Sequence, residues 1–166
     1  MSEQKHAIIY ISIDLVSGLT KMKNIVNELR SIGELRASST VYKKFRSRRA
    51  EDLNASIVMA TRWSLRASEA EVFEEIARIM DYHLSQNSWS GNLEIMFLAA
   101  TNTVRLVPEE NLPHPQLHMD SLILRCAAEV YGEYHHPILD QTLAELVLCS
   151  DPVRDAEFFD QGREIV

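Results

Sequence analysis

Hydrophobic residues recur along this chain at two kinds of spacing: in some segments they form short continuous or alternating runs, and in others they stand three and four residues apart. Short apolar, β-branched or alternating runs predict four strands, because successive side chains of a strand point to opposite faces. The predicted strands cover residues 8–13, 34–45, 53–63 and 93–99. Apolar residues spaced three and four apart predict helices, because residues with this spacing share one helix face. The predicted helices cover residues 22–32, 69–84 and 121–131.

The order strand, helix, strand, strand, helix, strand is that of a ferredoxin-like βαββαβ core. We therefore predict an α+β fold in which the first two helices cover one face of an antiparallel sheet. Gly33 is expected to end the first helix. Two capping-box patterns, at residues 68–71 and 142–145, predict further helix starts. A C-terminal helical and loop-rich extension follows the core and ends in a partly ordered acidic tail, residues 150–166.

Length and composition fit one domain, residues 1–166, with 46% hydrophobic and 25% charged residues. A chain of this length can bury a core without disulfide or metal staples. Cys126 and Cys149 lack a CxxC spacing and have apolar neighbours, so we expect buried free thiols in a reducing compartment. The apolar run at residues 7–13 is too short to span a membrane. The expected location is therefore cytoplasmic.

Positive charge is concentrated near the N-terminus. The net charge is −7, yet residues 1–50 hold ten Lys/Arg and four Asp/Glu, whereas residues 51–166 hold seven and twenty. The densest group of bases is Lys43, Lys44, Arg46, Arg48 and Arg49. This group can attract phosphates, or it can be a solvated loop between two strands. We expect no nucleic-acid partner, because the domain is acidic overall and one interleaved aromatic, Phe45, makes no stacking platform.

Few positions suggest chemistry by themselves. The glycines are isolated, which excludes P-loop and Rossmann enzymes. The four C-terminal histidines form two pairs without a third ligand at metal spacing, which favours hydrogen bonding or phosphate contact over a metal site. These are His114, His118, His135 and His136. Asn92 and Glu94 lie two apart on a predicted strand, so both point to one face, where their oxygens could hold a hard cation.

The C-terminal half contains an ordered set of motifs. They are LPHPQLH (112–118), LIL (122–124), AEV (128–130), HPIL (136–139) and TLAEL (142–146). In this order they resemble the 6-hydroxymethyl-dihydropterin pyrophosphokinase family, and the resemblance extends over residues 7–147. That family acts in folate biosynthesis, where it transfers a diphosphate from ATP to a pterin alcohol. The resemblance implies Mg²⁺ and ATP as cofactors of an active enzyme, and a pterin-like small molecule as its partner.

The resemblance also assigns roles to positions. Metal binding falls on Asn92 and Glu94, where the family has an Asp-x-Asp pair, and phosphate contact falls on His114. Asn54 would hydrogen-bond the pterin edge. The bases that would close over the nucleotide and assist catalysis are Arg46, Arg48 and Arg49. The other implied substrate-binding positions are Lys44, Phe45 and Leu122.

Departures from the family's pattern argue against full activity. Asn92 offers a neutral oxygen, so Glu94 alone would face two Mg²⁺ ions, which need dense negative charge. The arginine that the family has after the His-Pro motif falls on Asp120, which would repel a phosphate. We therefore predict a divergent family member with weak or lost activity. The alternative is a non-catalytic module on the same fold that binds a pterin, a nucleotide or another protein.

Overall fold

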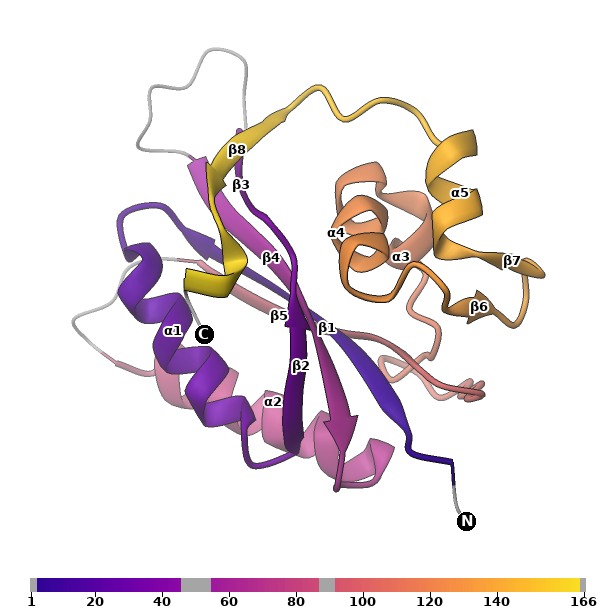
Figure 1. The fold of residues 1–166 in the computed structure, drawn as a ribbon. Helices are drawn as coiled ribbons and strands as arrows, with labels where there is room; N and C mark the ends of the chain where they lie inside the picture. The colour runs from indigo at the N-terminus through magenta and orange to yellow at the C-terminus, as the bar shows by residue number, and fades with distance from the viewer. Residues whose placement is uncertain (1–2, 46–54, 87–91, 165–166) are drawn as a thin grey trace.

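The computed structural model describes residues 3–45, 55–86 and 92–164, and its centre is an antiparallel sheet (Figure 1). The strand order is β5-β1-β4-β3-β8, while β2 pairs with the other half of β4. The strands are β1 (His6–Asp14), β2 (Gly33–Ser38), β3 (Val41–Phe45), β4 (Ala55–Leu65), β5 (Leu93–Ala100) and β8 (Ala156–Asp160).

Helices cover both faces of this sheet (Figure 1). On one face lie α1 (Gly18–Leu29) and α2 (Glu69–Leu84), and on the other lies α4 (Ser121–Tyr131). The smaller elements are α3 (Gln116–Met119), β6 (His135–His136), β7 (Gln141–Thr142), α5 (Leu143–Cys149) and the 3-10 turn η2 (Gly162–Glu164). This architecture confirms the predicted ferredoxin-like core with a helical C-terminal extension. Within the described residues, no helix has the length and apolar character needed to cross a membrane.

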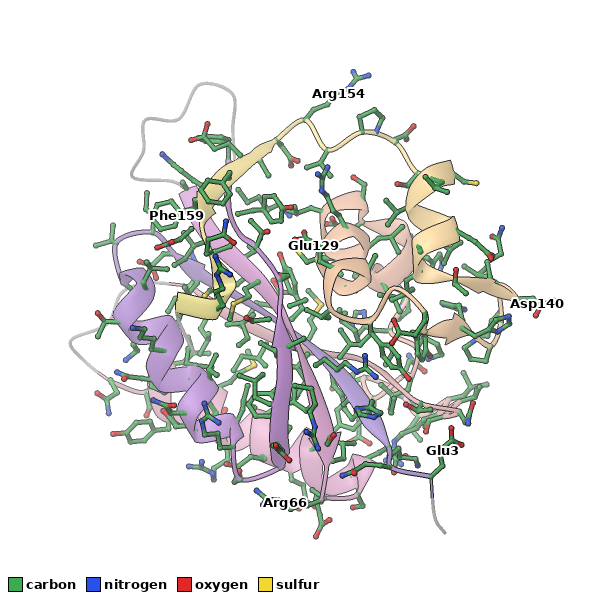
Figure 2. All side chains as sticks on the ribbon, viewed as in Figure 1. Glu3, Arg66, Glu129, Asp140, Arg154 and Phe159 are labelled. Carbon is green, nitrogen blue, oxygen red and sulfur yellow. The ribbon has the colours of Figure 1, made fainter. Side chains whose placement is uncertain are left out.

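Strand β1, which lies between β5 and β4, shows why both faces of the sheet are buried. Ile9 and Ile11 belong to the apolar layer under α1 and α2, whereas Ile8 and Tyr10 belong to the layer under α4. Side chains fill the spaces on both sides of the sheet (Figure 2). Ser12 is the next β1 residue on the α4 face, and it is half-buried and lines a pocket. The α4 layer therefore ends where the polar residues of β1 begin.

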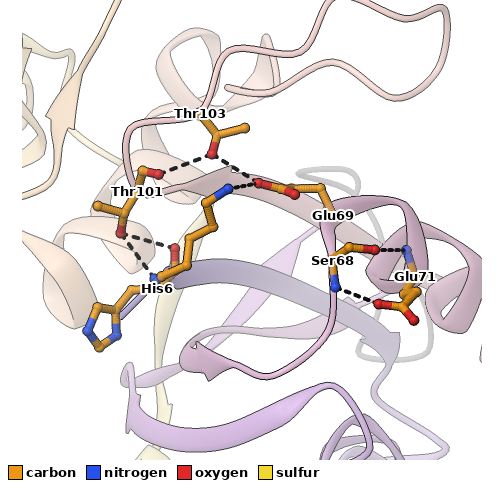
Figure 3. Close-up of polar contacts among 7 residues, drawn as sticks. His6, Ser68, Glu69, Glu71, Thr101 and Thr103 are labelled. Carbon is orange, nitrogen blue, oxygen red and sulfur yellow. Dashed lines mark hydrogen bonds and ion pairs between the residues drawn. The ribbon is translucent and has the colours of Figure 1, made fainter. Parts of the chain in front are cut away.

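The two predicted capping boxes are both present, and the one at α2 is shown in Figure 3. The backbone N–H of Glu71 donates to Ser68 Oγ (3.3 Å), and the N–H of Ser68 donates to Glu71 Oε2 (2.7 Å). Glu69, in the same turn, accepts from Lys5 Nζ and from Thr103 Oγ1. These contacts tie the start of α2 to the segments that precede β1 and follow β5.

The predicted strand at residues 34–45 is in fact two strands, which break at Ser39. Ser39 Oγ accepts the N–H of Ala60 (2.9 Å), and the N–H of Ser39 donates to the carbonyl of Ala60 (2.9 Å). A side-chain oxygen thus replaces a backbone carbonyl in the ladder, which interrupts the regular pairing with β4. The alternating pattern of side chains continues through Ser39, so this break could not be predicted from the pattern.

The prediction for Gly33 was also wrong. Helix α1 ends at Leu29, and Gly33 begins β2. A Cβ at Gly33 would lie 2.1 Å from the carbonyl oxygen of Ser64, so a glycine is needed here for close approach to β4. The residue marks tight strand pairing and not a helix end.

The C-terminal segment is more ordered than expected. Residues Ala156–Asp160 form β8, which pairs with β3 at the sheet edge, and the chain continues into η2. A Cβ at Gly162 would lie 1.8 Å from the carbonyl oxygen of Ser39, so η2 approaches the sheet closely. The expected burial of the cysteines is confirmed for Cys126 and wrong for Cys149, which is exposed at the end of α5.

The hairpin β6–β7 is built around a buried neutral histidine. His136 is 1% exposed, and its Nδ1 accepts the backbone N–H groups of Ile138 (3.3 Å) and Leu139 (3.2 Å). Burial lowers the pKa of His136, and the positive charges that His118 and His135 can carry lower it further. Protonation would place a proton on the nitrogen that accepts both hydrogen bonds, so the folded state requires the neutral ring.

This geometry predicts acid sensitivity. Because the folded-state pKa of His136 is lowered, its contribution to stability is present above the unfolded value of about 6.5 and is lost as the pH falls below it. We expect the wild-type protein to lose more unfolding free energy than His136→Asn between about pH 7.5 and about pH 5.5. Urea unfolding of the two proteins at several pH values measures this difference. Equal pH dependence of wild type and His136→Asn would contradict the prediction.

Candidate functional site

A polar pocket of about 400 Å³ opens on the α4 face of the sheet. Buried Tyr10 lies at its base, where the α4 layer ends. The polar residues that line it are Ser12, Lys44, Glu94, His114, Gln116 and Asp120. They come from β1, β3, β5 and the segment that leads into α4, so residues far apart in the sequence meet at one place.

Strand register brings the first of these residues together. Ser12 on β1 is the cross-strand partner of Glu94 on β5, and both lie on the face that carries Tyr10. Glu94 is exposed, which is unusual in a strand that is buried along most of its length. Lys44 on β3 also lines the pocket. Ser12 and Glu94 thus lie at one level of the sheet, and Lys44 lies at the level of Asp14, because Lys44 and Asp14 both pair with Ser56 of β4.

His114 is held in a defined orientation. Its backbone N–H donates to the carbonyl of Leu98 on β5 (2.7 Å), and its ring Nδ1 accepts the N–H of Gln116 (3.1 Å). With Nδ1 as an acceptor, the neutral ring carries its proton on Nε2. Burial lowers the pKa of His114, and the opposing effect of Glu94 is smaller. At neutral pH His114 is thus a hydrogen-bond donor through Nε2 and not a cation.

Asp120 has two roles that the sequence did not indicate. Its Oδ1 accepts the N–H groups of Leu122 (2.9 Å) and Ile123 (3.1 Å) and so caps α4. Its Oδ2 lies 3.6 Å from Lys44 Nζ. The repulsive charge expected at this position is therefore balanced by a lysine from β3.

A second pocket, also of about 400 Å³, adjoins the first. It lies beside α2, and its apolar lining includes Phe73, Ala77 and Met80. Ile95, Met96 and His114 line both pockets. Sequence reasoning missed this site, because the apolar spacing along α2 is the same for a core stripe and for a pocket wall.

The acidic residues that the structure describes do not gather into a cluster that could hold two magnesium ions. In the part of the chain that the structure describes, no group of three or more His, Cys, Asp or Glu side chains could hold a metal ion. Glu94 lines the polar pocket, while Asn92 lies exposed just before β5. Asp120 already accepts two backbone hydrogen bonds and pairs with Lys44. One carboxylate and one amide are a poor donor set for ions that need several anionic oxygens.

Leu122 and Phe45, two other predicted substrate-binding residues, are not part of the polar pocket's lining. Leu122 is 1% exposed and packs in the layer between α4 and the sheet, so its side chain does not reach the pocket lining. Phe45 ends β3, with Lys43 Nζ 5.2 Å from its ring centre, and it is also absent from the pocket lining. The predicted residues outside the described part of the chain are Arg46, Arg48, Arg49 and Asn54.

Comparison with known proteins gives structural relatives only. No protein-family model matches the chain, and no curated protein matches its sequence. A crystal structure of HPPK-DHPS in complex with substrates matches with a TM-score of 0.69 and 9% identity, covering 89% of this chain and 43% of that chain. Wild-type HPPK-DHPS of Plasmodium falciparum with pterin and p-hydroxybenzoate matches with a TM-score of 0.62 and 8% identity, with coverage of 89% and 43%.

HPPK abbreviates the pyrophosphokinase family that the sequence resembles. The chain spans less than half the length of these relatives. At such low identity the likeness concerns the fold alone. The protein therefore has the ferredoxin-like fold of the HPPK domain.

Proposed function

We propose that this protein is a divergent HPPK-type protein that binds ATP and a pterin-like compound, and that transfers diphosphate between them weakly or not at all. The observation that carries the proposal is the pair of adjoining pockets, which share Ile95, Met96 and His114. One pocket is polar, and the other is lined mainly by apolar side chains, together with Glu109, Glu110 and His114. This combination suits a ligand with a planar ring at one end and charged or hydroxyl groups at the other.

The apolar pocket suits the adenine ring of ATP. Phe73 packs against Phe97 with their ring centres 5.0 Å apart, which gives the pocket a firm aromatic wall. Met80 adds a polarisable side chain that adapts to flat rings. With the adenine ring bound here, the phosphates of ATP would extend past His114 into the polar pocket.

The polar pocket suits the phosphates and the pterin alcohol. His114 Nε2–H would donate to a phosphate oxygen, and Lys44 would offset part of its charge. The resemblance assigns the pterin edge to Asn54 and a closing role to Arg46, Arg48 and Arg49. Support for the pterin also comes from the P. falciparum relative of the same fold, which was crystallised with pterin.

Weak or absent diphosphate transfer is expected from the few oxygen ligands that the pocket offers to Mg²⁺. Catalysis of phosphoryl-type transfer depends mainly on positioning and on stabilisation of charge. Glu94 is a single carboxylate where two Mg²⁺ ions would need several anionic oxygens. Binding can therefore survive in these pockets while the rate of the chemical step falls.

Two measurements on the same preparation test the proposal. A ligand at about a hundred times its Kd stabilises a protein by about 2.7 kcal/mol, so ATP or hydroxymethyl-dihydropterin should raise the Tm by roughly 5–10 °C. Incubation with both ligands and Mg²⁺ should release AMP slowly or not at all. A Tm shift without AMP supports the non-catalytic form of the proposal. No Tm shift with either ligand at millimolar concentration, together with no AMP, would overturn it.

A further inference from the structure

Two oppositely charged side chains that line the polar pocket form an ion pair. Lys44 projects from β3, and Asp120 stands at the N-terminus of α4, with 3.6 Å between Lys44 Nζ and Asp120 Oδ2. Among the described residues that line this pocket, Lys44 is the one lysine or arginine. His114 does not add a positive charge at neutral pH, because burial lowers its pKa. Among the described residues of the lining, Lys44 is thus the positively charged side chain that an anion entering the pocket would meet.

The N-terminus of α4 cannot take the place of Lys44 in binding an anion. Helix N-termini attract anions through their free N–H groups. At α4 the N–H groups of Leu122 and Ile123 already donate to Asp120 Oδ1. The carboxylate of Asp120 therefore occupies this position and also places a negative charge beside it.

The contact between Lys44 and Asp120 is easily exchanged. Both side chains are partly exposed, at 31% and 26%, and partly exposed ion pairs stabilise a protein little. Asp120 is held in place by two backbone N–H groups that donate to its carboxylate. The Lys44 side chain is flexible, because it has four rotatable carbon–carbon bonds. Lys44 can leave Asp120 for a phosphate oxygen without disturbing the cap of α4.

We propose that Lys44 is the group that binds the phosphates of a ligand in the polar pocket, that it does so without a metal ion, and that Asp120 is its partner in the ligand-free state. This inference rests on the proposed function, and it specifies which side chain holds the phosphate groups of the ligand. Glu94 and Asn92 are a poor site for two Mg²⁺ ions, so a lysine carries the neutralising charge instead. Asp120 then competes with the ligand for Lys44.

The proposal predicts opposite effects for the two members of the pair. Lys44→Met should weaken ATP binding about tenfold or more, because the ligand loses its cation. Asp120→Asn should tighten ATP binding about threefold, because asparagine can still cap α4 but no longer attracts Lys44 or repels phosphate. A purely structural role for the pair would make both variants weaker binders. Lys43→Met, one residue earlier on β3 and outside the pocket lining, should leave the affinity unchanged.

Isothermal titration calorimetry with ATP and with inorganic tripolyphosphate provides the test, in EDTA and in Mg²⁺, with the Tm of each variant as a folding control. The expected result is nearly equal wild-type affinity in EDTA and in Mg²⁺, together with the opposite effects of the two variants. Wild-type binding that requires Mg²⁺, or unchanged affinity in Lys44→Met, would overturn the inference and leave the proposed function standing. No ATP binding in either buffer overturns the inference as well, and retained pterin binding would then preserve the pterin part of the proposed function.

Discussion

Replacing Trp63 by alanine is expected to lower the free energy of unfolding by about 3–5 kcal/mol. Trp63 is fully buried in the layer under α1 and α2, so its removal leaves a large cavity. Its indole N–H also donates to Thr61 Oγ1 (2.8 Å), whose hydroxyl donates to the carbonyl of Ile9 (3.0 Å). The substitution therefore removes both packing and one member of a buried hydrogen-bond chain that joins β4 to β1.

Urea unfolding followed by circular dichroism measures this loss. Trp63→Phe is the matched control, because it keeps most of the apolar volume and removes only the N–H donor. We expect Trp63→Phe to lose clearly less stability than Trp63→Ala. A loss below about 1 kcal/mol for Trp63→Ala would mean that this layer is not the well-packed core described above.

Filling the apolar pocket is expected to weaken ligand binding strongly. Ala77 is an exposed residue of α2 that lines this pocket, so Ala77→Trp would occupy the space without disturbing the buried face of the helix. We expect ATP affinity to fall about tenfold or more. The effect on stability should be small, because the substitution lies on the exposed side of α2.

The control for this prediction lies on the same helix. Ala70 is also exposed on α2 but is absent from the pocket lining, so Ala70→Trp should bind ATP as the wild type does. Calorimetric titration of both variants separates blocking of the pocket from a general effect of a surface tryptophan. Equal ATP affinity in Ala77→Trp and wild type would exclude this pocket as the base-binding site.

Most of the fold follows from local patterns in the sequence. Apolar periodicity located the strands and helices of the core, and the capping boxes marked the starts of α2 and α5. The failures arose from contacts between distant residues. The break at Ser39 depends on Ala60, and the need for a glycine at position 33 depends on Ser64. The segment that forms β8 needs β3 as a partner, so its charged composition suggested only a tail.

The candidate site was predictable only in part. Glu94 and His114 were selected from the sequence, and the structure brings both into the polar pocket together with Lys44. The pairing of Asp120 with Lys44 could not be predicted, because it depends on where α4 begins relative to β3. Leu122 was expected near the substrate, but it follows the cap of α4 and turns into the core.

The central claim is that ATP occupies the two adjoining pockets, and methyl NMR of methionine tests it most directly. Met80 lines the apolar pocket and Met96 lines both pockets, whereas Met22 and Met59 are buried in the layer under α1 and α2. Titration of ¹³C-methyl-labelled protein with ATP should shift the signals of Met80 and Met96 and leave those of Met22 and Met59 in place. Unchanged Met80 and Met96 signals at millimolar ATP, or equal shifts at all four methionines, would contradict the account.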